Sequence, residues 1–219
     1  MPTQEPAKVH LTPQGRVINH SLFNRDQYTP AKGQPGTPSY KIEMAFEKEA
    51  LNDIFNACLD YAVETWGEGA EDGVVIPIKD GDEMAAKREK LGKPGDAYAG
   101  MDVIRASTQF NRHGEKGPGG IQVLLQDKSL VTALNESEVY QGCYGIAAIT
   151  ISGYAEERTG NNAITFYLSA FQKTDDGERL VTQKDHSDLF KAVGRVAPAE
   201  GESVEDAAAA SGGRRRRAG

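Results

Sequence analysis

The sequence predicts a mainly β domain with one main helix, built either as a small closed barrel or as a sandwich. Three segments alternate apolar and polar side chains, as half-buried strands do: residues 40–46, 144–154 and 163–171. Between the first segment and the other two, residues 47–66 repeat apolar side chains at helical spacing. The alternation is typical of an antiparallel sheet with one wet face, and it does not decide between the barrel and the sandwich.

The alternation also assigns side chains to faces. In residues 40–46 the apolar face consists of Tyr40, Ile42, Met44 and Phe46, and the other face of Lys41, Glu43 and Ala45. In residues 144–154 the inward side chains are Ala147, Ile149 and Ile151. In residues 163–171 the inward side chains are Ile164, Phe166, Leu168 and Ala170, which leaves Phe171 outward. The helical stripe consists of Leu51, Ile54, Phe55, Cys58, Leu59 and Ala62.

Shorter strands and long loops complete the domain. Three further segments have the composition of strands: residues 16–23, 101–110 and 121–125. Residues 74–79 contain Pro77 and can form only an edge strand. Residues 24–38 are rich in proline and glycine, and residues 80–100 are highly charged, so we expect loops there, the second with at most a helical turn.

The chain divides into a central domain and two polar ends. Residues 1–15 contain three prolines and no periodicity, which predicts a flexible arm. The folded domain is expected over residues 16–195, and residues 196–219 predict a disordered tail. The tail ends in four arginines, Arg214 to Arg217. Its acidic residues are Glu200, Glu202, Glu205 and Asp206.

Composition restricts the classes of function. The formal net charge of −7 argues against nucleic-acid binding. This charge is an average over the whole chain, however, and binding needs only a local basic groove. We find no apolar run long enough for a membrane span and no signal-peptide pattern, so no membrane partner is expected. The two cysteines, Cys58 and Cys143, match no zinc or redox spacing and predict two buried thiols. The expected location is the cytoplasm, that of the host cell if a phage encodes the chain.

Outward aromatic rings form the first candidate site. Tyr144, Tyr154, Tyr167 and Phe171 fall on the wet face of the last two predicted strands. Every nucleic-acid base has a π-face, so rings on an open sheet can stack bases without reading sequence. Phe23 and Tyr28, in and after the first predicted strand, are further candidates. The alternative is that these rings cover a second core.

Basic residues near these rings form the second candidate site. Lys41 and Arg105 lie on the wet faces of their predicted strands. The remaining basic candidates lie in flanking loops: Lys32, Arg112, Lys116 and Lys173. A phosphate backbone needs cations spaced along a groove. The alternative is ordinary solvated surface charge.

An acidic cluster could suggest a metal site. Asp80-Gly81-Asp82 lies near Asp96 and Asp102, and clustered carboxylates hold divalent metals in nucleases. The same tripeptide is also a common turn sequence. No nucleophile elbow, phosphate-binding loop or dinucleotide fingerprint occurs, so we expect no catalytic residues, no metal and no cofactor.

Several motifs in order resemble the phage single-stranded DNA-binding proteins of the small replication type. The motifs are Leu22-Phe23, Tyr40-Lys41, Asp80-Gly81-Asp82, Tyr98-Ala99-Gly100, Tyr140-Gln141-Gly142-Cys143-Tyr144, Phe171-Gln172-Lys173 and Asp176-Gly177-Glu178-Arg179-Leu180. The resemblance covers about residues 16–180. It implies an OB-fold-like five-stranded antiparallel barrel with one main helix and long loops. It also implies single-stranded DNA on the open face and an acidic tail that recruits replication or recombination proteins. The ending Arg214 to Arg217 departs from that pattern.

Three hypotheses of function follow. The first is sequence-independent binding and protection of single-stranded DNA during phage replication, recombination or repair, by a monomer or a homodimer. The second is a phage structural or assembly protein with a β-barrel or sandwich domain. The third is a metal-dependent nuclease that uses Asp80, Asp82 and Asp102.

Overall fold

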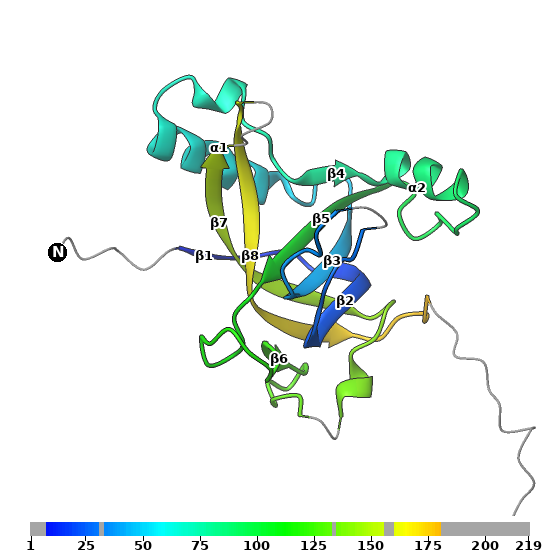
Figure 1. The fold of residues 1–219 in the computed structure, drawn as a ribbon. Coiled ribbons are helices and arrows are strands. Elements are labelled where there is room, and N and C mark those ends of the chain that lie inside the picture. Colours follow the sequence, from blue (N-terminus) through cyan, green and yellow to red (C-terminus); the bar gives the residue numbers. More distant parts are fainter. Residues whose placement is uncertain (1–7, 31–32, 133–134, 156–159, 181–219) are drawn as a thin grey trace, which may run out of the picture. The chain divides into compact units, whose positions relative to one another are not determined.

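The computed structural model describes residues 8–30, 33–132, 135–155 and 160–180. All of them belong to the first of two units, residues 1–182. Their elements, in chain order, are β1 (Val9–Leu11), β2 (Gly15–Asp26), β3 (Ser39–Glu47), α1 (Asn52–Trp66), η1 (Ala70–Asp72), β4 (Ile78–Asp80), α2 (Gly81–Glu89), β5 (Met101–Thr108), β6 (Gln122–Leu124), η2 (Glu136–Glu138), β7 (Tyr144–Ala155) and β8 (Asn162–Asp175) (Figure 1). Among these helices, none is both long and apolar enough to cross a membrane.

Five of the strands close into a ring in the order β2-β3-β5-β8-β7, with β7 pairing back to β2. The predicted mainly β fold and five-stranded barrel are therefore confirmed. The prediction of a wholly antiparallel barrel is wrong, because β5 and β8 are parallel. An odd number of strands cannot alternate in direction all round a closed ring, so one pair must run parallel. The short strands β1, β4 and β6 add to β7, β5 and β8 outside the ring.

The barrel core contains most of the side chains that alternation assigned to it. Tyr40, Ile42, Met44 and Phe46 of β3 are at most 1% exposed. Ala147, Ile149 and Ile151 of β7 and Ile164, Phe166 and Leu168 of β8 are also buried. The thiols of Cys58 and Cys143 are free and buried, as predicted, and burial raises the pKa of Cys58 to about 12 and also raises that of Cys143.

Helix α1 packs against β7 near one end of the barrel. Its residues Ile54, Cys58 and Ala62 are buried, and the Tyr61 hydroxyl accepts a hydrogen bond from the Gly153 N–H at 3.0 Å. The Trp66 ring lies where a Cβ on Gly153 would stand. The helix begins at Asn52 and not at residue 47 as predicted, because β3 continues to Glu47 and a turn follows.

Two segments predicted to lack regular structure contain some. Residues 1–15 were expected to form a flexible arm, yet Val9–Leu11 pairs with β7 as strand β1. The next residue, Thr12, is buried, and its Oγ1 accepts a hydrogen bond from the Ala147 N–H at 3.0 Å. In the predicted charged loop 80–100, residues Gly81–Glu89 form α2, whose first turn is capped by the Asp80 carboxylate.

A second, smaller apolar cluster covers part of the outer face of the barrel. It joins Ala45 of β3 and Val103 of β5 to Ile18, Ala85 and Tyr98. The face of β3 that we expected to be wet is therefore partly covered, with Ala45 at 1% and Glu43 at 6% exposure. The covering layer consists of α2, which Figure 1 shows outside the ring strands, and the segment that follows it.

A β-bulge in β8 changes which side chains face inward. Ala148 pairs with Ala170 but Ile149 pairs with Leu168, so Ser169 is an extra residue on β8. Beyond the bulge the alternation is reversed, and Phe171 is 1% exposed while Ala170 is partly exposed. The predictions that Ala170 faces inward and Phe171 outward are therefore wrong.

The bulge predicts very different effects for two neighbouring substitutions. Phe171→Ala should lower the free energy of unfolding by about 3–5 kcal/mol, because it leaves a cavity in the core. Ser169→Ala, at an exposed position, should change it by less than about 0.5 kcal/mol. Urea unfolding followed by circular dichroism measures both. A small effect of Phe171→Ala would show that the ring lies outside the core.

Candidate nucleic-acid interface

Three adjoining cavities form a groove on the outer face of β2, β3 and β5, and we call it the β3–β5 groove. The cavities have volumes of about 300, 650 and 680 Å³, and Glu43 and Arg105 line all three. The smallest is also lined by Asn19, Tyr28 and Lys41. Three predicted site residues, Tyr28, Lys41 and Arg105, are thus brought together, although they come from three separate segments of the chain.

Basic side chains outnumber acidic ones along the β3–β5 groove. The seven basic lining residues are Arg16, Lys41, Lys79, Lys87, Arg88, Arg105 and Arg179. The five acidic ones are Glu43, Asp80, Glu83, Asp96 and Glu178. The groove therefore carries a formal excess of positive charge in a chain whose net charge is −7. A local basic groove of this kind suits a polyanionic ligand.

A hydrogen-bonded network lies in the floor of the groove. The Glu43 carboxylate accepts a hydrogen bond from the Tyr98 hydroxyl at 2.7 Å and pairs with the Arg105 guanidinium, whose Nε lies 3.1 Å away. Burial, the hydrogen bond to Glu43 and the charge of Glu43 raise the pKa of Tyr98 to about 12. Tyr98 therefore remains a protonated donor at neutral pH.

An exposed tyrosine lies beside the groove on the same face of the barrel. Lys41 of β3 pairs with Ser107 of β5, and Ser107 pairs with Tyr167 of β8. Tyr167 is 47% exposed and lies about two strand spacings, or about 10 Å, from Lys41. Tyr28, 71% exposed, lines the groove itself. Cations and two accessible rings therefore lie on the same outer face of the barrel.

Lys41 has an acidic partner within the protein. Its ammonium group forms an ion pair with Asp26, and the hydrogen bond and charge of Lys41 lower the pKa of Asp26. The Asp26 side chain is 54% exposed, so water screens this pair strongly. If a phosphate replaced Asp26 as the partner of Lys41, little energy would therefore be lost from the broken pair.

The other predicted rings do not line the groove, although Tyr144 pairs with Arg16 of the groove lining in the β2–β7 register. Tyr154 is 50% exposed at the far end of β7, and Tyr144 is partly buried at the near end, roughly 30 Å along the same strand. Phe23 is partly buried against the barrel core. Arg112 is exposed in the loop that follows β5, where its N–H donates to the Gly120 carbonyl. These four residues line none of the three cavities.

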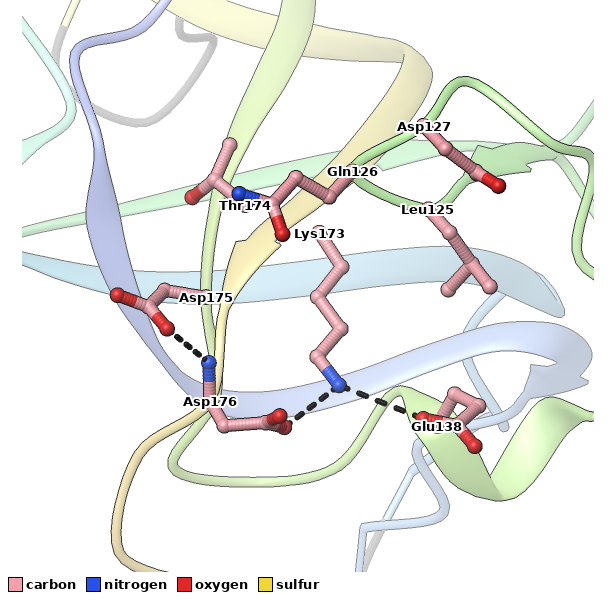
Figure 2. Close-up of a pocket in the computed structure, with 8 residues that line it drawn as sticks. All are labelled: Leu125, Gln126, Asp127, Glu138, Lys173, Thr174, Asp175 and Asp176. Carbon is pink, nitrogen blue, oxygen red and sulfur yellow. Dashed lines mark hydrogen bonds and ion pairs between the residues drawn. The ribbon is translucent and has the colours of Figure 1, made fainter.

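Lys173 is placed differently from our expectation of a flanking loop. It lies on β8 beyond the bulge and is 7% exposed, with Nζ 2.6 Å from Asp176 and 3.6 Å from Glu138 (Figure 2). Two carboxylates therefore already neutralise this cation in its own cavity. Lys32 and the tail residues Glu200, Glu202, Glu205 and Asp206 lie outside the described residues.

Several basic residues of the groove were not predicted from the sequence, namely Arg16, Lys79, Lys87, Arg88 and Arg179. Arg88 and Lys87 belong to α2, in a segment predicted to be a loop, and Arg179 follows the last strand. The guanidinium of Arg88 lies 5.0 Å from the centre of the Tyr98 ring. Charge density in residues 80–100 was the available signal, but no local pattern shows which of these charges face the barrel.

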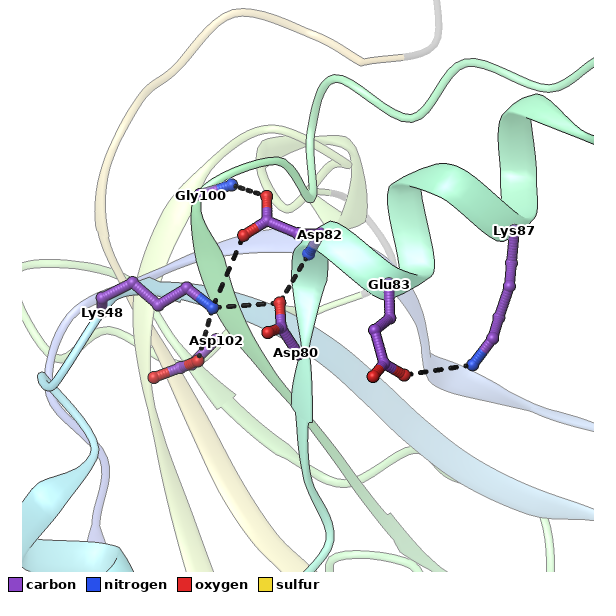
Figure 3. A network of polar contacts seen from close by, with 7 residues as sticks. All are labelled: Lys48, Asp80, Asp82, Glu83, Lys87, Gly100 and Asp102. Carbon is purple, nitrogen blue, oxygen red and sulfur yellow. Dashed lines mark hydrogen bonds and ion pairs between the residues drawn. The ribbon is translucent and has the colours of Figure 1, made fainter.

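The acidic cluster considered for a metal is held together by a lysine. Lys48 Nζ lies 3.0 Å from Asp80, 3.3 Å from Asp102 and 3.8 Å from Asp82 (Figure 3). Asp80 and Asp82 also accept backbone hydrogen bonds, from Asp82 and Gly100. The ammonium group therefore holds the position among the carboxylates that a divalent cation would need. No group of metal-ligating side chains is found in the part of the chain that the structure describes.

The lysine-centred cluster predicts a pH-dependent effect of Lys48→Met. The hydrogen bond from Lys48 lowers the pKa of Asp80, so this pairing stabilises the fold above about pH 4 and is lost as the pH falls through the lowered pKa. The variant should melt at a lower temperature at pH 7, with a difference that shrinks toward pH 3.

Thermal unfolding between pH 7 and pH 3 measures this difference. Lys87→Met removes the same charge from an exposed pair with Glu83 and serves as the control. A difference for Lys48→Met that stays constant with pH would contradict the assigned pairing.

The strand ring and the groove together define an OB-type barrel, a class whose open face binds oligonucleotides and oligosaccharides. The family model described as "Enterobacter phage Enc34, ssDNA-binding protein" matches residues 23–203, and the chain belongs to this family. Among curated proteins, none matches the sequence significantly.

Solved structures of two phage proteins share this fold. The single-stranded DNA-binding protein of bacteriophage Enc34 in complex with single-stranded DNA superposes with a TM-score of 0.54 at 20% identity, covering 79% of this chain and 89% of that chain. A second structure of the single-stranded DNA-binding protein from bacteriophage Enc34 gives a TM-score of 0.53 at 18% identity, covering 84% of this chain and 90% of that chain. The bacteriophage T7 protein gp2.5, also a single-stranded DNA-binding protein, gives 0.53 at 11% identity, covering 88% and 100%.

Proposed function

We propose that this protein binds single-stranded DNA without sequence preference and protects it during phage DNA replication, recombination or repair. The observation that carries the proposal is the β3–β5 groove, in which basic side chains exceed acidic ones beside the exposed rings of Tyr28 and Tyr167. Membership in a family described by its single-stranded DNA-binding protein supports it.

The groove supplies two kinds of contact. Its arginines and lysines bind phosphates, which all nucleotides share, and the tyrosine rings stack bases through faces that all bases share. Neither contact distinguishes one base from another, so binding is indifferent to sequence. A single strand fits this arrangement because its bases are free to stack, whereas duplex bases are already stacked on one another.

We propose a binding protein and not an enzyme. The carboxylates considered for a nuclease surround Lys48, and the one buried carboxylate of the groove, Glu43, is paired with Tyr98 and Arg105. A structural or assembly role, our second hypothesis, would not require a surplus of cations beside accessible rings. Recruitment of replication proteins by the acidic tail, a homodimer and a cytoplasmic location are further parts of the proposal.

Salt dependence tests the electrostatic part of the function. If about four groove cations neutralise phosphates, the logarithm of the association constant should fall with the logarithm of salt concentration at a slope of about −3. Titration of fluorescent oligo-dT between 50 mM and 300 mM salt, roughly the range in which such slopes are resolved, measures it. Duplex of the same length is the comparison. Equal affinity for duplex and single strand, or a slope near zero, would refute the proposal.

Alanine substitutions test the stacking part. Tyr167→Ala and Tyr28→Ala should each weaken oligo-dT binding by about 1–3 kcal/mol, the usual size of a base–aromatic stack, and leave the melting temperature almost unchanged. Tyr154→Ala tests whether the bound DNA extends to the far end of β7. Phe55→Ala on α1, which removes a 43% exposed ring remote from the groove lining, is the matched control. Unchanged affinity in all the tyrosine variants would exclude stacking on these rings.

A further inference from the structure

The floor of the β3–β5 groove contains a buried negative charge. Glu43 is 6% exposed and lies in all three cavities, where it would repel the phosphates of a bound strand. Burial of a carboxylate is also costly unless the charge is paired and hydrogen-bonded. A residue that opposes both folding and binding in this way requires an explanation from its contacts.

The contacts of Glu43 connect two arginines of the groove. On one side its Oε2 accepts hydrogen bonds from Nε, at 3.1 Å, and Nη2 of Arg105, the residue opposite it in the β3–β5 register. On the other side its Oε1 accepts the Tyr98 hydroxyl at 2.7 Å. The Tyr98 ring in turn lies under the Arg88 guanidinium, which is fixed further by a hydrogen bond of 2.8 Å from its Nε to the Pro94 carbonyl.

This pairing leaves both arginines able to bind an anion. Glu43 occupies the Nε edge of Arg105, and a guanidinium has five N–H donors, so the Nη1 end remains for a ligand. The Arg105 side chain is 57% exposed in spite of its buried partner. Arg88 and Arg105 both line the two larger cavities. Glu43, Tyr98 and the Pro94 carbonyl thus hold the two guanidinium groups in place, and both arginines still line the groove.

We propose that Glu43 is a positioning residue for DNA binding: together with Tyr98 it holds Arg105 and Arg88 as a preset pair that receives backbone phosphates. The proposal rests on the proposed single-stranded DNA-binding function and names the part of the groove that grips the backbone. A mobile arginine side chain on a protein surface loses conformational entropy when it binds phosphate. A side chain that is already held in place loses less. The gain from this preorganisation exceeds the repulsion between Glu43 and the phosphates.

Two substitutions of Glu43 separate its geometry from its charge. Glu43→Gln keeps an acceptor for Arg105 and removes the charge, so it should bind oligo-dT as tightly as the wild type or more tightly. Glu43→Ala removes acceptor and charge together and should weaken binding by at least about threefold, the effect of one hydrogen bond. If Glu43 acted through its charge alone, both variants would tighten binding to the same extent, and the proposal would be overturned.

Coupling to Arg105 provides the second readout. Arg105→Ala should weaken binding and reduce the magnitude of the salt slope by about 0.7, the amount for one phosphate contact on a single strand. Glu43→Ala should reduce the slope in the same direction, and the loss that it adds to Arg105→Ala should be smaller than its loss in the wild type, because only its effect through Tyr98 on Arg88 remains. Additive losses would overturn the proposal, because a positioning residue has less effect once a group it positions is absent.

The experiment uses the full chain, titrated with fluorescent oligo-dT at four salt concentrations, and a melting curve for each variant. Glu64→Gln and Glu64→Ala, at an exposed position on α1, make the same changes of charge outside the groove and should leave affinity unchanged. If Glu43→Ala does not fold, Tyr98→Phe decides, since it keeps the ring under Arg88 and removes only the hydroxyl. It should weaken binding in the wild-type background and weaken it less with Arg105→Ala; unchanged affinity in the wild-type background would overturn the proposal. Failure of the wild type itself to bind oligo-dT would instead refute the function.

Discussion

Closure of five strands into a ring is the constraint on which the rest of this domain depends. Because the ring has an odd number of strands, one pair of neighbouring strands must be parallel. Here that pair is β5 and β8, in which Ala106 pairs with Phe166 and Ser107 with Tyr167. That pairing places Tyr167 beside the strand that carries Arg105, although the two residues are distant in the sequence. An accessible ring and a basic groove share one face because of the way the barrel closes.

The outer face of the barrel has two parts with different roles. One part is covered by α2 and Tyr98, whose apolar contacts with Ala45 and Val103 form a second cluster outside the barrel. The other part is bare and presents Tyr167 to solvent. The groove lies along the boundary between them, where a covered polar residue such as Glu43 can be both buried and adjacent to a ligand. The covering layer therefore provides the low-dielectric surroundings in which paired charges are held firmly.

The sequence predicted the features that depend on local pattern and missed those that depend on long-range contact. Alternation identified β3, β7 and β8 because each has one face in the core, and composition indicated β2 and β5. Alternation could not locate the bulge, because Ala170 and Phe171 are both apolar and either could face inward. Lys173 is neutralised by Glu138 of another segment as well as by Asp176 three residues on, and Lys48 comes from another segment to occupy the acidic cluster. Composition alone cannot distinguish a free charge from a paired one.

The two buried thiols make this chain convenient for chemical labelling. A cysteine reacts through its thiolate, and both Cys58 and Cys143 have raised pKa values in addition to being inaccessible. In the folded protein they are therefore inert toward maleimides and mild oxidants. A single cysteine introduced on the open barrel face can therefore be labelled selectively in the native chain. The rate at which Cys58 and Cys143 are alkylated then measures how often the whole barrel opens.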